Sequence, residues 1–157
     1  MTNVLDIEAT ETFTVGTESV AIRLPSEATG DALFGFDVQM PPGGGPPMLH
    51  HHDPFEMYRV LDGELTFYLG DEAGVVRRSV AKAGSVVAIP AGREHTIRNE
   101  SGADARAFVV FSPGKPMEGF LRGAHALSAE GPPRPEQIIA LAEEHGIRMT
   151  RPIPPSA

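Results

Sequence analysis

Short runs of β-branched and aromatic residues, separated by glycine, proline, asparagine and aspartate, follow one another along the chain as far as Phe111. Their spacing of about 8 to 12 residues favours an all-β sandwich or barrel. In one run, Phe34, Phe36, Val38 and Met40 alternate with Gly or polar residues, so we expect their side chains on the inward face of a strand. The pattern predicts nine strands, at residues 12–15, 19–24, 32–40, 56–61, 64–69, 75–80, 85–89, 95–98 and 105–111.

The strand pattern ends after Phe111, where a Ser-Pro-Gly-Lys-Pro stretch begins. Proline cannot donate to a β-ladder, so we expect the barrel to end near Pro113. A second proline-rich stretch at 131–135 is typical of a rigid linker. The chain is therefore predicted to have a barrel domain over residues 1–113 and a C-terminal extension over 114–157.

Within the extension, apolar residues recur at helical spacing between Glu136 and His145. Pro135 suits the first turn of a helix, and Gly146 stands where a glycine often ends one. We predict a single helix over 136–145, packed on the barrel or on a neighbouring subunit. The proline-rich end, 151–157, is expected to fray.

The composition narrows the classes of partner that this chain is expected to bind. The chain has 157 residues, 41% of them hydrophobic and 22% charged, which suits one globular domain. Its 21 acidic and 13 basic side chains leave a net charge of −8, a balance that repels nucleic acid and anionic lipid. No apolar run is long enough to span a membrane. Because the chain has no cysteine, disulfides, thiolate metal sites and a cysteine nucleophile are excluded.

The first ten residues alternate polar and apolar side chains and include Asp6 and Glu8. A secretion signal would instead have a basic start and a continuous apolar segment. We therefore expect a cytoplasmic protein.

Candidate chemistry concentrates around His50, His52 and Glu56, which are separated by even numbers of residues. Even spacing puts side chains on one face of a strand, so the three ligand atoms could converge, with Tyr58 on the same face and His51 pointing away. The Asp-Pro pair between the second histidine and the glutamate could break this parity, which the spacing alone leaves open.

A second stretch, residues 84–99, supplies His95 at the start of another predicted strand. Three imidazoles and one carboxylate suit several divalent ions, namely Fe, Ni, Mn, Cu or Zn, so the ligand set is better predicted than the metal. Imidazole must be neutral to bind, so metal affinity should fall as the pH drops through the histidine range.

Both stretches match the two motifs of the cupin superfamily position by position. The first motif, G-x5-H-x-H-x3-E-x6-G, falls on Gly44, His50, His52, Glu56 and Gly63, and the second, G-x5-P-x-G-x2-H-x3-N, falls on Gly84, Pro90, Gly92, His95 and Asn99. The chain thus resembles cupins over about residues 32–111. The resemblance implies a double-stranded β-helix, or jelly-roll barrel, and one divalent transition metal held by His50, His52, Glu56 and His95.

The stretch from Pro46 to Glu56 resembles small quercetin-dioxygenase-like proteins more narrowly. In quercetinases this glutamate both binds the metal and takes a proton from the substrate hydroxyl, which implies a catalytic role for Glu56. The resemblance leads us to expect an oxygenase acting on a small enolic or phenolic substrate. A non-redox isomerase or cyclase, and a non-catalytic module that binds a small ligand, remain alternatives because one fold hosts many functions.

Five side chains are candidates for a substrate pocket beside the metal, with core or wall packing as the alternative role. These are Phe36, Met40, Met48, Tyr58 and Ile97. Cupins are often dimers, so the resemblance also leads us to expect a homodimer, with the N-terminal strands or the helix at 136–145 available for the contact.

Overall fold

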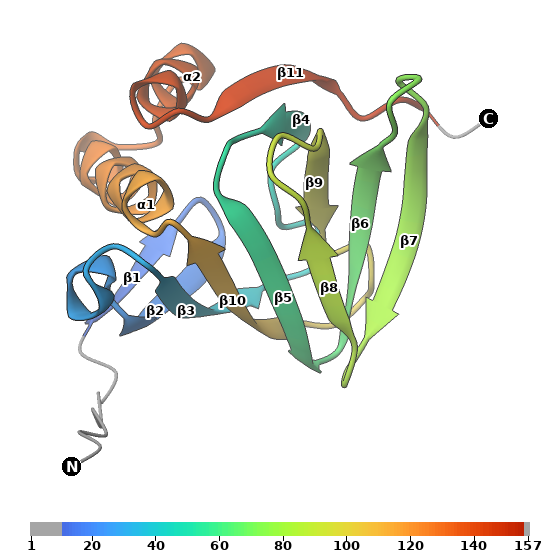
Figure 1. Cartoon of the computed structure of the whole chain (residues 1–157), viewed down its shortest axis with the longest axis horizontal. Helices are drawn as coiled ribbons and strands as arrows, with labels where there is room; N and C mark the ends of the chain where they lie inside the picture. Colours follow the sequence, from blue (N-terminus) through green and yellow to red (C-terminus); the bar gives the residue numbers. More distant parts are fainter. Residues whose placement is uncertain (1–10, 156–157) are drawn as a thin grey trace.

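Two antiparallel sheets face each other, with two helices at one end (Figure 1). The computed structural model describes residues 11–155, so residues 1–10, on which the expected lack of a secretion signal rests, lie outside the described part. One sheet contains, in hydrogen-bonded order, β1 (Glu11–Val15), β2 (Glu18–Leu24), β3 (Phe34–Met40), β10 (Ala105–Ser112), β5 (Phe55–Asp62) and β8 (Val86–Ile89). The other contains β11 (Arg148–Pro152), β4 (Met48–His51), β9 (His95–Arg98), β6 (Glu64–Gly70) and β7 (Val76–Lys82).

This architecture is the predicted double-stranded β-helix with a short helical extension. All nine predicted strands form, with ends that shift by at most two residues. The inward face of β3 is confirmed, because Phe34, Phe36, Val38 and Met40 are all buried in the core between the sheets. Two strands escaped the prediction, β4 and β11, and these two pair with each other at one edge of the smaller sheet.

The helix α1 (Lys115–Leu127) was also not predicted. Its sequence is a poor helix former because it contains Gly119 and Gly123, each of which costs about 1 kcal/mol relative to alanine. Its first backbone N–H groups are capped from a distant loop, since a carboxylate oxygen of Asp31 accepts from the amides of Gly114 at 3.1 Å and Lys115 at 2.7 Å. The cap lies outside the local sequence, so local signals could not reveal it.

The helix predicted over 136–145 is confirmed as α2 (Pro135–Glu144), with a proline in its first turn and Gly146 in the left-handed conformation just after its end. Two glycines of α1 leave the room that α2 needs to pack against it. A Cβ at Gly119 would lie 2.6 Å from the ring of His145, and a Cβ at Gly123 would lie 2.9 Å from Leu141. The two glycines therefore allow the two helices to pack closely. Short 3-10 turns are found at Ser26–Thr29 (η1) and Ser128–Glu130 (η2).

The expectation of a frayed end over 151–157 was wrong for its first two residues, while residues 156–157 lie outside the described part of the chain. Arg151 and Pro152 belong to β11, which is hydrogen-bonded to β4. Proline is tolerated there because β11 is an edge strand. The end is also fastened by a side chain of the barrel, since Glu94 accepts hydrogen bonds from Thr150 at 2.6 Å and from Arg151 at 2.7 Å.

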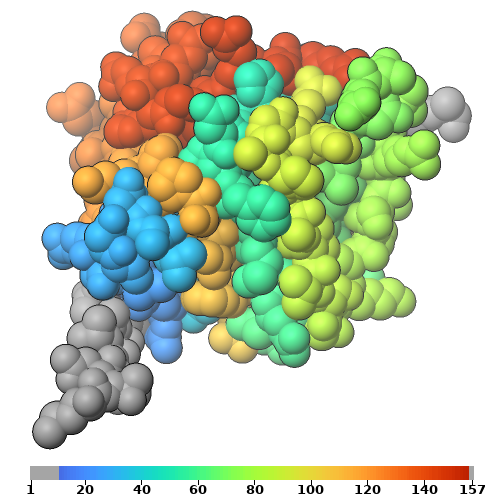
Figure 2. Space-filling model, viewed as in Figure 1, coloured from blue at the N-terminus to red at the C-terminus, as the bar shows by residue number. Residues whose placement is uncertain are grey.

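The extension covers one end of the barrel rather than standing apart from it. In Figure 1, α1 and α2 lie beside the end of the barrel and β11 runs from them across β4, and Figure 2 shows their atoms in direct contact with the barrel strands. Among residues 11–155, no helix is both long and apolar enough to cross a bilayer.

Candidate metal centre

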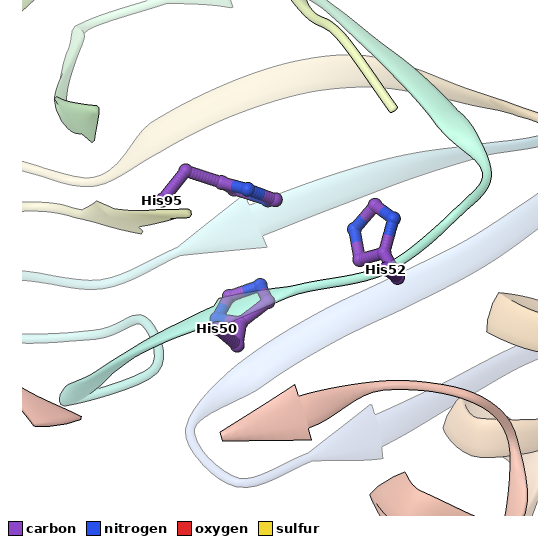
Figure 3. A group of neighbouring side chains, drawn as sticks. All are labelled: His50, His52 and His95. Carbon is purple, nitrogen blue, oxygen red and sulfur yellow. The ribbon is translucent and has the colours of Figure 1, made fainter. Parts of the chain in front are cut away.

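Three histidine side chains converge inside the barrel, where Figure 3 shows them pointing toward one another. His50 lies on β4, His95 begins β9, and the two are paired residues across these strands. His52 follows β4 in the bend that leads to β5. All three are buried, and their potential ligand atoms lie within 4.8 Å of one another.

Each imidazole is oriented by a backbone carbonyl two residues away. The Nδ1 atoms of His50, His52 and His95 lie 3.3, 2.9 and 2.7 Å from the carbonyl oxygens of Met48, Pro54 and Arg93. A carbonyl oxygen can only accept, so Nδ1 carries the hydrogen in each ring. In a neutral ring Nε2 is then the atom left to bind a metal, and it faces the interior, which is the arrangement that outer-sphere partners impose on metal-binding histidines.

Glu56 completes the cluster from β5. Its Oε2 atom lies 3.0 Å from Nε2 of His52 and 2.9 Å from Nε2 of His95, and the residue is only 1% exposed. The side-chain parity that the Asp-Pro pair left in doubt is therefore preserved. Tyr58 and Val60 are buried on the same side of β5, as expected, while His51 is only half buried.

Burial and mutual contact shift the pKa values of the cluster. Burial, reinforced by the nearby His95, lowers the pKa of His50 to about 4, so this imidazole is neutral at physiological pH. Burial alone would raise the pKa of Glu56, but hydrogen bonds from His52 and His95 outweigh it and hold that pKa well below its ordinary range. Burial would lower the pKa of His95, yet its hydrogen bond to Glu56 raises it.

This donor set fits a divalent transition metal. Nε2 of His52 and of His95 can donate to Glu56 only while it carries a proton, and an ion that replaces those protons would meet three nitrogen lone pairs and an anionic oxygen in one small volume. Such a cluster of electron-pair donors needs a shared cation, and neutral imidazoles with one carboxylate suit iron, nickel, manganese, copper or zinc. His50, His52, Glu56 and His95 would hold that ion.

Other motif residues shape the backbone around the cluster. Asn99 is fully buried, and its amide donates to the carbonyls of Met40 and Ala103, both at 2.8 Å. A Cβ at Gly44 would lie 2.7 Å from the Met40 side chain, and one at Gly63, which has a positive φ of 71°, would lie 2.7 Å from the carbonyl oxygen of Asp104. These motif positions therefore serve close packing and tight turns.

A cavity of about 580 Å³ lies against the cluster, and His50 and Glu56 form part of its wall. All five predicted pocket side chains line it, namely Phe36, Met40, Met48, Tyr58 and Ile97. The other part of the lining was not predicted. It comes from the extension, with Met117, Phe120 and Leu121 of α1, Ile138 and Ile139 of α2, and Ile147 and Met149 at β11. The helical spacing of apolar residues at 138–142 was the only sequence signal for a packed face in the extension, and it did not identify the surface that this face contacts.

Comparison with known proteins supports the family. Residues 36–111 match the family model described as a cupin domain. A search of curated proteins found no match. Together with the fold, the family match supports the cupin superfamily for this part of the chain.

Solved structures share the fold at low sequence identity. A mutant of Bacillus subtilis oxalate decarboxylase has a TM-score of 0.60 and 18% identity, over 73% of this chain and 31% of that one. A Cupin 2 conserved barrel domain protein from Salinispora arenicola CNS-205 has a TM-score of 0.55 and 18% identity, over 70% of this chain and 90% of that one. The polyketide cyclase RemF from Streptomyces resistomycificus has a TM-score of 0.53 and 22% identity, over 71% and 79%. These likenesses concern the fold.

Proposed function

We propose that this chain, with a cupin domain whose three imidazoles and one carboxylate converge beside a cavity, is a metal-dependent oxygenase acting on a small enolic or phenolic substrate. The observation that carries the proposal is the double position of Glu56. Its Oε2 atom is within 3.0 Å of two imidazole nitrogens, and the same residue lines the cavity. One carboxylate could therefore serve as ligand and as base toward a substrate hydroxyl.

The metal, when bound, would supply Lewis acidity and, if it is redox-active, electron transfer to O2. The protein's own contribution begins with proton transfer. Because the pKa of Glu56 is held low by its imidazole partners, its carboxylate is ionised at neutral pH. A low pKa makes it a weak base, so its acceptance of a proton from a substrate hydroxyl would rely on the lowering of that hydroxyl's pKa that a bound metal would supply. The apolar wall of the cavity keeps bulk water away from the deprotonated substrate.

Tyr58 is the second polar group that faces the substrate space. Burial, with the neighbouring Glu56 carboxylate, raises the pKa of Tyr58 well above its ordinary value, so the phenol stays protonated. It can therefore donate a hydrogen bond to an oxygen of the bound substrate and orient it beside Glu56.

Substitution of Glu56 tests the proposal. We expect Glu56→Gln to lower the rate of O2 consumption with enolic or phenolic substrates by at least about 100-fold, because the amide cannot accept the proton. An oxygen electrode measures the rate, and elemental analysis of the natively expressed protein and of the variant measures the metal. Glu72→Gln, at an exposed turn, is the matched control and should consume O2 at the wild-type rate. Substrate turnover undiminished under argon would contradict an oxygenase.

A non-redox isomerase or cyclase is the second candidate, favoured by the pairing of a base and an acid on one face of β5. Glu56 is ionised and Tyr58 is protonated, and both line the cavity. Turnover under argon that is lost in both Glu56→Gln and Tyr58→Phe would support this candidate. Ligand binding without turnover, unchanged in Glu56→Gln, would support a binding module instead.

A further inference from the structure

The outer face of the six-stranded sheet is apolar along three neighbouring strands. The inward side chains of β10, β5 and β8 fill the core, so the alternate positions point outward. These outward positions are Phe108 and Val110 of β10, Phe55 and Met57 of β5, and Val86 and Ala88 of β8. Phe55 is 44% exposed and Val86 55%.

Neither helix covers this face. In Figure 2 the atoms of β5 and β8, drawn in teal and yellow-green, lie at the surface, and the helices stand beside them. The solvated face of an antiparallel sheet is normally polar, because its side chains alternate between core and water. A continuous apolar face is typical of a surface that another molecule covers.

One row of paired residues crosses this face with opposite charges on its two sides. Asp37 is paired with Phe108 across the β3–β10 ladder, and Phe108 is paired with Arg59 across the β10–β5 ladder. Neighbouring strands lie about 4.7–4.9 Å apart, so the carboxylate and the guanidinium flank the phenyl ring at similar distances. The ring itself lies over Gly35, where a Cβ would be 3.1 Å from it.

Both charges of this row are available for a partner. Among residues 11–155, Arg59 is exposed and forms no ion pair, and the contact of Asp37 with Arg23 is long, at 3.8 Å. By contrast, the outward Arg106 is paired with Asp62 at 2.9 Å. A carboxylate and a guanidinium without close partners at the edges of an apolar surface favour a partner with complementary charge.

A second copy of the chain has that complementary charge. If two such faces pack about a two-fold axis along β10, each Phe108 meets its counterpart, and Asp37 lies opposite Arg59 of the partner subunit. The symmetry forms this ion pair twice. Stacked sheets lie about 10 Å apart, a gap that the side chains of both faces fill. The net charge of −8 disfavours an anionic lipid surface as the cover.

We propose that the outer face of β3, β10, β5 and β8 is a homodimer interface, in which Asp37 and Arg59 flank Phe108 and pair with their counterparts on the partner subunit. This face is distinct from β1, β2 and α2, the elements that the sequence left available for a dimer contact. The interface backs the strand that carries Glu56, since β5 has Glu56 and Tyr58 on its inward side and Arg59 on its outward side. The inference goes beyond the proposed function and does not rest on it.

Charge exchange across the row tests the inference. We expect the full-length wild type to sediment as a dimer, and Arg59→Asp and Asp37→Arg each to raise the dimer dissociation constant at least about 100-fold, because two like-charge contacts replace two ion pairs. The double variant Asp37→Arg/Arg59→Asp should restore it to within about threefold of the wild type, since the same pairs form with their charges exchanged. Sedimentation velocity over a dilution series measures the constant.

Arg77→Asp, at an exposed position on β7 in the other sheet, is the matched control for the change in net charge and should dimerise like the wild type. Circular dichroism checks the fold of each variant. If a charge reversal does not fold, Arg59→Ala removes the ion pair without adding repulsion and should raise the dissociation constant about tenfold.

Three results would overturn the inference. A wild type that is monomeric throughout the series would leave this face to another occupant. A dimer that persists unchanged in Arg59→Asp and Asp37→Arg would use another surface. Single variants that dissociate without recovery in the double variant would show that these two residues do not face each other across a two-fold axis.

Discussion

Single residues around the proposed metal centre depend on backbone atoms as much as on one another. The carbonyls of Met48, Pro54 and Arg93 set the orientation of the three imidazoles, and the glycine loop at 43–45 packs between β9 and the start of β4. In that loop the amide of Gly43 donates to the Asn99 carbonyl at 2.8 Å. The loop also lines the cavity, so its backbone conformation bears on both stability and binding.

Alanine substitutions at two glycines of this loop distinguish the cost of backbone strain from the cost of a steric clash. Gly43 has a φ of 80° with nothing within 4 Å of a Cβ, whereas at Gly45, with a φ of 102°, a Cβ would lie 2.1 Å from the carbonyl oxygen of Ile97. We expect Gly43→Ala to lower the free energy of unfolding by about 1–2 kcal/mol, the cost of a left-handed alanine. Gly45→Ala should lower it by about 3–4 kcal/mol or prevent folding. Urea unfolding measures both, and equal losses would contradict the assigned clash.

The elements of the extension exist because of contacts made far along the chain. The helix α1 is capped by Asp31 and also tied to η1, since one carboxylate oxygen of Glu118 accepts the amide hydrogen of Ser26 at 2.7 Å. The other oxygen accepts from Arg122 at 3.0 Å. The strand β11 similarly depends on its partner β4.

Glu118 makes the attachment of α1 dependent on pH. Burial alone would raise the pKa of Glu118, but the hydrogen bonds from Ser26 and Arg122 lower it below the ordinary value. A carboxylate with a lowered folded-state pKa stabilises fully above its unfolded pKa of about 4.3, and the stabilisation is lost as the pH falls through the folded value. We expect Glu118→Gln to lower the free energy of unfolding by about 1 kcal/mol at pH 7.

The deficit should shrink as the pH falls below about 4, because the wild-type carboxylate is then also protonated. Urea unfolding at a series of pH values measures it. Glu27→Gln, at an exposed position next to Ser26, is the control and should unfold like the wild type at every pH. A deficit that is the same at pH 7 and at pH 3 would show that the charge of Glu118 does not contribute.

At the scale of the whole molecule, residues of α1, α2 and β11 line the cavity into which the proposed metal ligands of the barrel face. The pairing of Met149 with His50 brings together parts of the sequence that are 99 residues apart, and it makes the extension part of the cavity. The expected homodimer stays a prediction. Metal binding, by contrast, should be coupled to the stability of the whole chain, because the four proposed ligands come from β4, the bend after it, β5 and β9.

Metal removal should therefore lower the thermal unfolding midpoint. An ion at 100 times its dissociation constant stabilises the folded state by about 2.7 kcal/mol, which is about 5–10 °C for a chain of this size. We expect a chelator such as EDTA to produce that decrease, and re-addition of the metal found by elemental analysis to reverse it. The double variant His52→Ala/His95→Ala should show no response to chelator. If the chelator removes the metal from the wild-type protein and the thermal unfolding midpoint does not change, the proposed metal centre is contradicted.

Local periodicity and turn chemistry determined most of the barrel. Side-chain alternation, a local property of the chain, predicted the inward face of β3. The resemblance to the two cupin motifs, and not strand parity, predicted that His95 and Glu56 join His50 and His52. The same parity identified Tyr58 as a neighbour of Glu56 in the cavity wall.

Only the tertiary structure decided what surrounds the proposed metal centre. The helix α1 contains two glycines that disfavour a helix and has a cap supplied by Asp31, and β11 contains a proline and is held by its pairing with β4. Both gain their stability from partners about 84 to 101 residues away, so no window of sequence contains the reason for them. For the same reason the sequence by itself predicted the fold and the proposed ligand set, and only the tertiary structure decided that an apolar wall faces that proposed set.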